Sequence, residues 1–413
     1  MIRGKKDMKI ITVKRDQELL LIPDAFIDVT DGEVLKNKAL LISKGRIRKI
    51  ISSDAAYRLA EREKIKYLYL SGITFMPGLI DCHVHFALDG VDFHQALGRW
   101  DNEVLLNEHV AKAAANFLSC GVTTVRDGGD KECIGLKVRN SIKDGSFPGP
   151  LVNASGYVLR KDGYYGTFLG AGIKSIDEGK EQIKELSHLG VDQIKIAVSG
   201  IVSFKELGKV GPVQFTQEEL TALVQESHDQ GLKVMAHASS DQAVRISALA
   251  GVDSIEHGFF VSTSTLELMA EKKIAWVPTV APMALLTEEP QRKLRAPEEI
   301  EILEKTYRPH LDMIKKAETM GILLGIGTDA GAIGVEHGVS YYHEVRLFHQ
   351  AGLSNLSCLQ AATCQAAKII GREGELGEIT LGKVPRLTGF MGNPLNNLTV
   401  LRNPACIVLP EFN

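Results

Sequence analysis

The segment MPGLIDCHVH, residues 76–85, decides how the rest of the chain is interpreted. It ends in His83 and His85, two residues apart, so on a β-strand both imidazoles project to one side and can bind a single cation. Cys82 points the other way, as a small buried apolar residue. A His-x-His pair alone is a weak signal. After Pro-Gly, an apolar run and Asp81, it predicts metal ligands at the end of a strand.

Strand-like and helix-like segments alternate from residue 72 to about residue 371, which is typical of a parallel sheet covered by helices. One helix is expected at 176–189 and another at 216–230, where Thr216 and Glu219 have the spacing of a capping box. Eight such units favour an α/β fold with a closed (β/α)8 TIM barrel over an open sheet. The eight strands are expected at 74–85, 123–127, 151–155, 193–198, 233–237, 254–257, 274–279 and 323–329.

Both ends of the chain have a different pattern, with short strands separated by turns. The turn signals Asp31-Gly32 and Lys44-Gly45 are of the hairpin kind. We therefore expect a small β-sandwich built from residues 1–71 and 376–413, with the barrel of residues 72–375 between its two parts. The expected strands before the barrel are 9–13, 19–29, 39–43, 46–51 and 67–70.

Composition excludes several classes of protein. Of 413 residues, 44% are hydrophobic and 24% are charged, and the net charge of -3 lacks the basic excess of a nucleic-acid-binding protein. No apolar run is long enough to span a membrane, and the basic residues 1–15 precede an apolar stretch too short for a signal peptide. Six scattered cysteines without a CxxC pair are expected to be reduced thiols. We expect a cytoplasmic homo-oligomer whose partner is a small-molecule substrate, without nucleic acid or membrane.

Three more polar residues end predicted strands, where catalytic groups of a barrel lie. His237 and His257 end consecutive strands and are suited to a second cation. Asp329 ends the eighth strand among glycines that allow close approach, with helix capping or turn formation as its alternative role.

Lys195 lies in the apolar strand 193–198, where a charged ammonium is costly to bury. The ordinary alternative is a lysine whose stem is buried while its head reaches solvent. We expect instead that burial lowers its pKa, so that the neutral amine captures carbon dioxide. The resulting carbamate would be an anionic bridge between two metal ions.

The motif of residues 77–85, the lysine strand, the segment SIEHG at 254–258 and the GTD of 327–329 resemble the binuclear branch of the amidohydrolase superfamily. The resemblance covers nearly the whole chain. Within the superfamily the chain is most similar to imidazolonepropionase-related amidohydrolases, which include Xaa-Pro and Xaa-Arg dipeptidases. The resemblance implies hydrolysis of an amide-like bond, with a ligand set of His83, His85, carboxylated Lys195, His237, His257 and Asp329.

The chain departs from the dipeptidase pattern at positions expected to face substrate. GYYG at residues 163–166 replaces Gly-Gly-His-Gly, and Ser239 replaces an aromatic residue. A third departure, KVPRL at 383–387 in place of Gly-Lys-x-Ala-Asp-Leu, concerns the terminal strands. The candidate substrate contacts, each with a surface or structural role as its alternative, are Tyr164, Tyr165, Arg126 and His337.

The expected mechanism uses two divalent cations, with zinc as the expected metal, and a hydroxide that bridges them and attacks a polarised carbonyl. Asp329 would take the proton and pass it to the leaving amine. A dipeptide or an N-acyl amino acid is the expected substrate. Alternatives are a cyclic-amide hydrolase, a non-catalytic barrel, against which the complete ligand set argues, and a mononuclear deaminase. The deaminase would need no lysine and usually has a glutamate near the fifth-strand histidine, where this chain has ASSD at 238–241.

Overall fold

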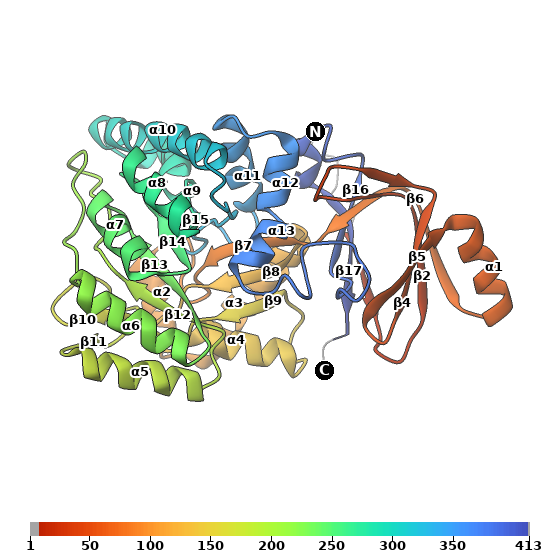
Figure 1. Ribbon diagram of the computed structural model, residues 1–413, viewed down its shortest axis with the longest axis horizontal. Helices are drawn as coiled ribbons and strands as arrows, with labels where there is room; N and C mark the ends of the chain where they lie inside the picture. The colour runs from red at the N-terminus through yellow and green to blue at the C-terminus, as the bar shows by residue number, and fades with distance from the viewer. Residues whose placement is uncertain (1–7, 412–413) are drawn as a thin grey trace.

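Two regions make up the computed structural model, which describes residues 8–411: a mixed sheet built from both ends of the chain and a larger part with parallel strands and helices (Figure 1). Residues 1–7 and 412–413 lie outside the described residues. They include part of the basic N-terminal segment and the outer ends of the two predicted parts of the β-sandwich. None of the helices within 8–411 combines the length and the hydropathy that crossing a membrane requires.

The mixed sheet, called here the terminal sheet, joins strands from both ends of the chain. Its order is β1 (Lys9–Val13), β17 (Pro404–Pro410), β16 (Leu387–Met391), β6 (Lys66–Pro77), β2 (Leu19–Ile27), β4 (Lys38–Ser43) and β5 (Arg46–Ser52), with β3 (Val34–Lys36) paired to β2. Apolar side chains of one face, such as those of Phe26, Phe75 and Val408, form one cluster. On the other face, α1 (Ser53–Glu63) packs against Leu20 and Leu41. These strands form one continuous sheet, whereas the layers of the predicted sandwich would be separate sheets.

The expected strand at 74–85 is two strands, which corrects the sequence prediction. β6 belongs to the terminal sheet, and β7 (Leu79–Val84) begins the parallel part. Gly78 separates them because its N–H donates to the carbonyl of Arg386, and because a Cβ there would lie 2.1 Å from Thr123 Oγ1. The predicted boundary at residue 72 therefore falls inside β6.

The parallel part contains two sheets, which confirms the α/β class with parallel strands. The first has the order β7, β8 (Val122–Asp127) and β9 (Leu151–Ala154). The second has the order β11 (Gly172–Ile173), β10 (Val158–Lys161), β12 (Gln193–Ala197), β13 (Lys233–Ala238), β14 (Ser254–His257) and β15 (Ala275–Val277). All ladders in both sheets are parallel.

The eighth expected strand, 323–329, is not a strand in the structure but connects the two sheets. Trp276 N–H donates to Leu323 O at 2.8 Å, and Cys82 N–H donates to Ile326 O at 2.7 Å. Isolated bridges also join this segment to β15 and β7. The segment contains Gly325 and Gly327 and ends at Asp329, whose left-handed backbone (φ +56°) departs from strand geometry. No ladder within residues 8–411 joins β9 to β10, so the sheet is not continuous around the predicted barrel.

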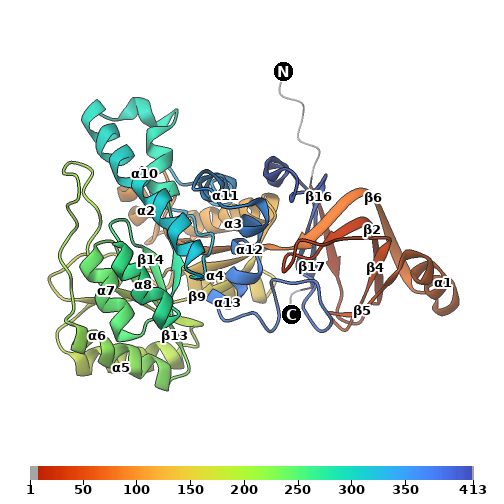
Figure 2. The same cartoon turned by 45° about the horizontal axis from the view of Figure 1, so that its top comes forward.

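Helices surround the parallel strands, and the main apolar core lies between the two (Figures 1 and 2). Two of them, α5 (Ile176–His188) and α6 (Gln217–Asp229), occur where the sequence predicts, and both hydrogen bonds of the Thr216–Glu219 capping box are present. The others are α2 (Phe93–Arg99), α3 (Glu103–Ser119), α4 (Ile134–Lys143), α7 (Asp241–Ala250), α8 (Thr263–Lys272), α9 (Ala281–Ala284), α10 (Pro297–Thr319), α11 (Tyr341–Gln350), α12 (Asn355–Ala361) and α13 (Cys364–Ile369), with short 3-10 helices at Leu285–Thr287, Gln291–Leu294 and Leu398–Arg402.

Candidate metal centre

Three polar side chains converge beyond the C-terminal end of β7. His83 lies in this strand, His85 directly follows it, and Asp329 comes from the connecting segment. Nε2 of His83 lies 3.4 Å from Nε2 of His85, and each of these atoms lies 3.5 Å from Oδ1 of Asp329. These potential ligand atoms all lie within 4.8 Å of one another. Two imidazoles and a carboxylate at this spacing can bind one divalent cation.

A second group of side chains adjoins the first. The ring of His257, at the end of β14, lies 5.0 Å from that of His83 and 4.5 Å from that of His237 in β13. Lys195 in β12 is buried, and its Nζ has no hydrogen-bond partner. A buried ammonium without a partner is costly, whereas a carbamate between two cations would be paired. The residues present therefore fit a pair of divalent ions with a modified lysine.

Hydrogen bonds at Nδ1 orient the imidazoles of β7. His83 Nδ1–H donates to Oε2 of Glu256 at 2.8 Å, and His85 Nδ1–H donates to the carbonyl of Gly129 at 3.1 Å. With Nδ1 protonated, the lone pair of each ring is on Nε2, the atom that faces Asp329. Both histidines are thus held in the tautomer that a metal ligand needs.

The other two histidines use different ring atoms. His257 Nδ1 is 2.6 Å from the hydroxyl of Thr279, which leaves Nε2 free of that contact. His237 Nε2–H donates to the carbonyl of Gly200 at 3.3 Å, so its Nδ1 would be the ligand atom.

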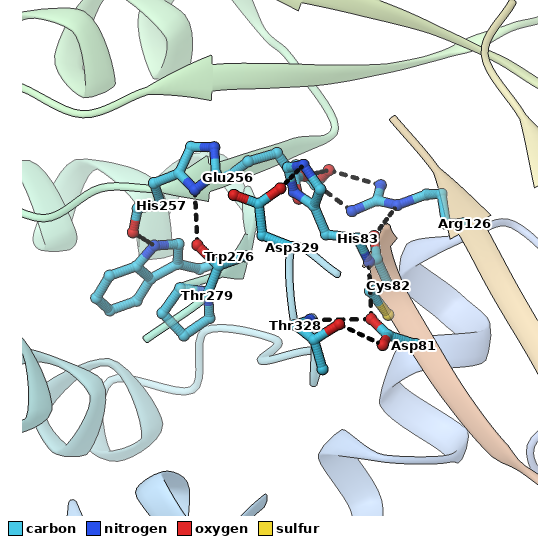
Figure 3. Close-up of polar contacts among 12 residues, drawn as sticks. Asp81, Cys82, His83, Arg126, Glu256, His257, Trp276, Thr279, Thr328 and Asp329 are labelled. Carbon is cyan, nitrogen blue, oxygen red and sulfur yellow. Dashed lines mark hydrogen bonds and ion pairs between the residues drawn. The ribbon is translucent and has the colours of Figure 1, made fainter. Parts of the chain in front are cut away.

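A buried ion pair lies beside His83 (Figure 3). Arg126 in β8 donates to Oε1 of Glu256 at 2.8 Å, to Ser254 Oγ at 2.9 Å and to the carbonyl of Cys82 at 2.6 Å. The carboxylate of Glu256 thereby joins Arg126 to His83. The guanidinium is fully engaged within the protein, so the structure gives Arg126 a supporting position and not the substrate contact that was considered for it.

Asp81, the acid of the opening motif, fixes the segment that carries Asp329. It accepts hydrogen bonds from Thr328 N–H at 3.0 Å and from the Thr328 hydroxyl at 2.7 Å. Asp329 N–H donates to the carbonyl of His83 at 2.7 Å. The left-handed backbone of Asp329, and those of His257 (φ +69°) and Thr279 (φ +46°), are unfavourable conformations that this network holds at the site.

Burial controls protonation in the centre. It lowers the pKa of His85 to about 3 and that of His237 to about 4, with the charge of Lys195 acting in the same direction. The pKa values of His83 and His257 are lowered well below the usual value, again first by burial. The imidazoles are therefore neutral at pH 7, as lone-pair donors must be.

Burial also shifts the two remaining groups. The pKa of Lys195 is lowered to about 8, since desolvation outweighs the attraction of Glu256. Burial raises the pKa of Asp329 to about 6, against the opposing effect of Lys195. With this pKa about one tenth of the lysine is neutral at pH 7, and only the neutral amine can form a carbamate.

All six expected ligands line one cavity of about 660 Å³, together with Tyr164 and Tyr165. His337 does not line it. Its Nε2–H donates to the carbonyl of His85 at 3.0 Å, and its ring stacks on Phe86 with 5.9 Å between centroids. His337 therefore supports the chain behind His85 and, like Arg126, lies away from the place of a substrate.

The sequence interpretation missed three supporting residues: Glu256, Asp81 and Thr279. Glu256 and Asp81 were visible as acids inside predicted strands, where an unpaired carboxylate would be costly, and that signal could have marked them. Nothing in the sequence marked Thr279, because its contact with His257 depends on the three-dimensional approach of β14 to the end of β15.

Comparison with known proteins gives a consistent result. A family model described as "Amidohydrolase family" matches residues 74–410. Ochratoxinase of Aspergillus niger is 28% identical over 94% of this chain and 83% of its own length. Imidazolonepropionase of Legionella pneumophila is 24% identical over 89% of this chain and 91% of its own length. The crystal structure of a Xaa-Pro dipeptidase with methionine bound in its active site matches with a TM-score of 0.80 and 27% identity, covering 94% of this chain and 97% of the other.

Proposed function

This chain belongs to the amidohydrolase family, as its motifs predict, and from that premise we propose that it uses two divalent cations to hydrolyse an amide-type carbon–nitrogen bond. One observation carries the proposal: six potential ligands from both parallel sheets and their connecting segment line a single cavity, and Lys195 among them is buried without a partner. Zinc is the expected metal, because imidazole and carboxylate donors suit it.

The proposed assignment divides the ligands between two ions. His83, His85 and Asp329 would hold one cation, and His237 and His257 the other. A carbamate formed from Lys195 and carbon dioxide would contribute one oxygen to each. The short distances among the ligand atoms of His83, His85 and Asp329 support the first half of this assignment. The ring contact between His237 and His257 supports the second.

When bound, the two cations supply a nucleophilic water at neutral pH and polarise the substrate carbonyl. Asp329 would accept a proton from the attacking water and deliver it to the leaving nitrogen, so that a C–O bond forms and the C–N bond breaks. Glu256 keeps the ring of His83 in place through Nδ1, and Asp81 fixes Asp329 through Thr328. The substrates considered are dipeptides and N-acyl amino acids, with cyclic amides as an alternative.

We extend the proposal to the fold. The two parallel sheets and the segment 323–330 together would constitute a (β/α)8 barrel whose closure depends on isolated hydrogen bonds in place of ladders. Residues 72–375 would contain this barrel, and residues 1–71 and 376–413 the smaller β-domain. The solved relative with a TM-score of 0.80 over 94% of this chain supports a shared architecture.

A mononuclear deaminase is the second candidate, because among the described residues only His83, His85 and Asp329 form a compact group of ligand atoms. A single ion at that group would leave Lys195 without a role. The burial of its unpaired Nζ favours the binuclear proposal.

The test is metal analysis combined with turnover. Protein prepared with ample zinc and bicarbonate should contain about two equivalents of metal per chain. It should also hydrolyse members of a panel of N-acyl amino acids, dipeptides, lactams and cyclic ureas, and lose turnover after chelation. One reproducible equivalent with full activity, or release of ammonia from aminated heterocycles without amide hydrolysis, would contradict the binuclear amidohydrolase.

A further inference from the structure

Apart from the potential metal ligands, most side chains that line the cavity are apolar or aromatic. Among the described residues, Lys195 is the only lysine or arginine that lines it, and Asp89 and Asp329 are its only acids. The apolar and aromatic lining residues include Phe93, Tyr165, Phe168, Phe204, Phe259 and Met283.

These residues form two apolar walls from different parts of the fold. In the first wall, Phe168 packs edge-on against Phe93 with 4.8 Å between ring centroids, and Tyr165 lies 6.1 Å from Phe168. The second wall belongs to a separate core cluster that contains Phe259 and Met283. The cavity is therefore bounded by aromatic or aliphatic surface on more than one side of the metal ligands.

Three arginines that contact lining residues are engaged in other interactions. Arg99 donates to Asp89 at 2.8 Å, and Arg160 donates to backbone carbonyls that include that of Tyr164 at 3.0 Å. The guanidinium of Arg295 lies 5.8 Å from the centre of the ring of Phe204, and Arg295 does not line the cavity. Apart from Lys195, no lysine or arginine of the described lining is available to a substrate carboxylate. Burial of a carboxylate here would remove its hydration without replacing it.

We propose, on the basis of the proposed function, that the site takes an uncharged amide with a bulky apolar group on each side of the scissile bond. It discriminates against substrates with a free carboxylate beside that bond. This narrows the substrate class, since free dipeptides and N-acyl amino acids carry that carboxylate. The specificity comes from the walls and not from the metal ligands.

A matched pair of amides tests the inference. N-(phenylacetyl)phenethylamine has an aromatic ring on each side of one amide bond, and N-(phenylacetyl)phenylalanine differs from it only by an added carboxylate. With the zinc-loaded protein, kcat/KM for the neutral compound should be higher by about tenfold or more, because the site leaves the carboxylate unpaired. N-acetylphenethylamine and N-ethylphenylacetamide, which each lack one ring, should both be poorer. Equal or better turnover of the carboxylate compound would overturn the inference.

Binding to the metal-free protein separates this inference from the proposed function. The walls do not depend on metal, so calorimetry on the metal-free Lys195→Met variant, which removes the one cationic side chain of the described lining, should give tighter binding of the neutral amide than of its carboxylate partner. If that preference is found but no amide is hydrolysed by the loaded protein, the proposed function fails and the inference stands. If the carboxylate compound binds as tightly, the inference fails whatever the activity.

A matched pair of variants provides a second test. Ile201 and Leu207 lie on the loop between β12 and α6, which extends away from the parallel strands (Figure 2), and each is 52% exposed. Only Ile201 lines the cavity. Ile201→Arg should shift the selectivity ratio toward the carboxylate compound by about tenfold, because it adds a cation to the lining. Leu207→Arg should leave the ratio unchanged. An equal shift in both variants would indicate general charge attraction and would overturn the specific role of the cavity lining.

Discussion

The terminal sheet and the ends of the parallel strands bury different kinds of side chain. In the terminal sheet a cluster of apolar residues such as Phe26 and Phe75 fills the interior. At the C-terminal ends of the parallel strands, Arg126, Glu256 and Lys195 are buried instead. Apolar burial stabilises a fold without further partners, whereas buried charges need other charges or ligands. The apolar cluster of the terminal sheet therefore stabilises the fold. The charged groups at the ends of the parallel strands are buried at a cost in stability, which ligands or counter-charges can offset.

The largest effect is expected from Lys195→Ala, which removes the group that distinguishes the two regions most clearly. Loss of the bridging ligand should lower metal affinity and kcat/KM by more than about 100-fold. Loss of a residue that only orients a ligand typically lowers them by about 10–100-fold. Metal content and turnover on the neutral amide measure this. Short carboxylic acids should partly restore both, because they can occupy the place of the carbamate.

Lys195→Arg is the control for charge and size. It should be as defective as the alanine variant, because a guanidinium stays cationic and forms no carbamate. Full metal content in either variant would contradict the bridging role. So would high-resolution density for an unmodified lysine in an active, fully metallated protein.

Glu256→Gln should have the next largest effect. It leaves the charge of Arg126 buried without a counter-charge and weakens the orientation of His83, so metal affinity should fall by about 10–100-fold and stability should also decrease. Ser254→Ala is the matched control, because it removes only a neutral hydroxyl that donates to Glu256 at 2.7 Å. A loss of metal affinity in the control equal to that in Glu256→Gln would show that packing, and not the ion pair, positions His83.

The sequence was sufficient for the family, for the parallel α/β class and for most strand positions. Residues such as Thr216 and Glu219, or the run around Lys195, carry local signals whose structural meaning does not depend on distant contacts. The break at Gly78 could not be read from the sequence, because an apolar run continues on both sides and the interruption depends on Thr123 and Arg386. The eighth strand was predicted wrongly for a related reason, since glycines in 323–330 favour irregular backbone.

The six expected ligands could be brought together in the prediction because each one lies in a predicted strand or at its end. The structure places them around one cavity. Arg126 and His337 illustrate the limit of that approach. Both are polar residues close to the expected site in the sequence pattern. Arg126 donates to Glu256, and His337 donates to the carbonyl of His85, and each of these partners is distant in the sequence. Which polar residues face a cavity and which lie behind it depends on packing.

Phe26→Ala tests the other region. The side chain is fully buried and its ring lies 6.2 Å from that of Phe75, so the variant should lose about 3–5 kcal/mol of stability from the cavity that it creates. Denaturant unfolding measures this. Metal content and kcat/KM of the folded protein should be unchanged. Phe26→Leu, which preserves more volume, should be less destabilising. A loss of metal from the folded alanine variant would show that the two regions are coupled.

The smallest expected effect concerns His310, which is buried in α10 of the parallel part but does not line the cavity. Its Nε2–H donates to the carbonyl of Pro278 at 3.1 Å, and burial lowers its pKa from 6.5 to about 4. Because the folded state binds the proton more weakly than the unfolded state, the stability from neutral His310 is complete above pH 6.5 and is lost toward pH 4. Between pH 7.5 and pH 5 the loss should be about 2 kcal/mol. The variants His310→Gln and His310→Asn have no titrating group at this position. Each should unfold with a lower free energy than the metal-loaded wild type at pH 7.5, and this difference should become about 2 kcal/mol smaller at pH 5. Denaturant unfolding at both pH values measures it. If the difference in the free energy of unfolding did not change with pH, His310 would contribute only through packing and its hydrogen bond. The contrast between regions with buried polar groups and regions with apolar burial would then be confined to the metal centre.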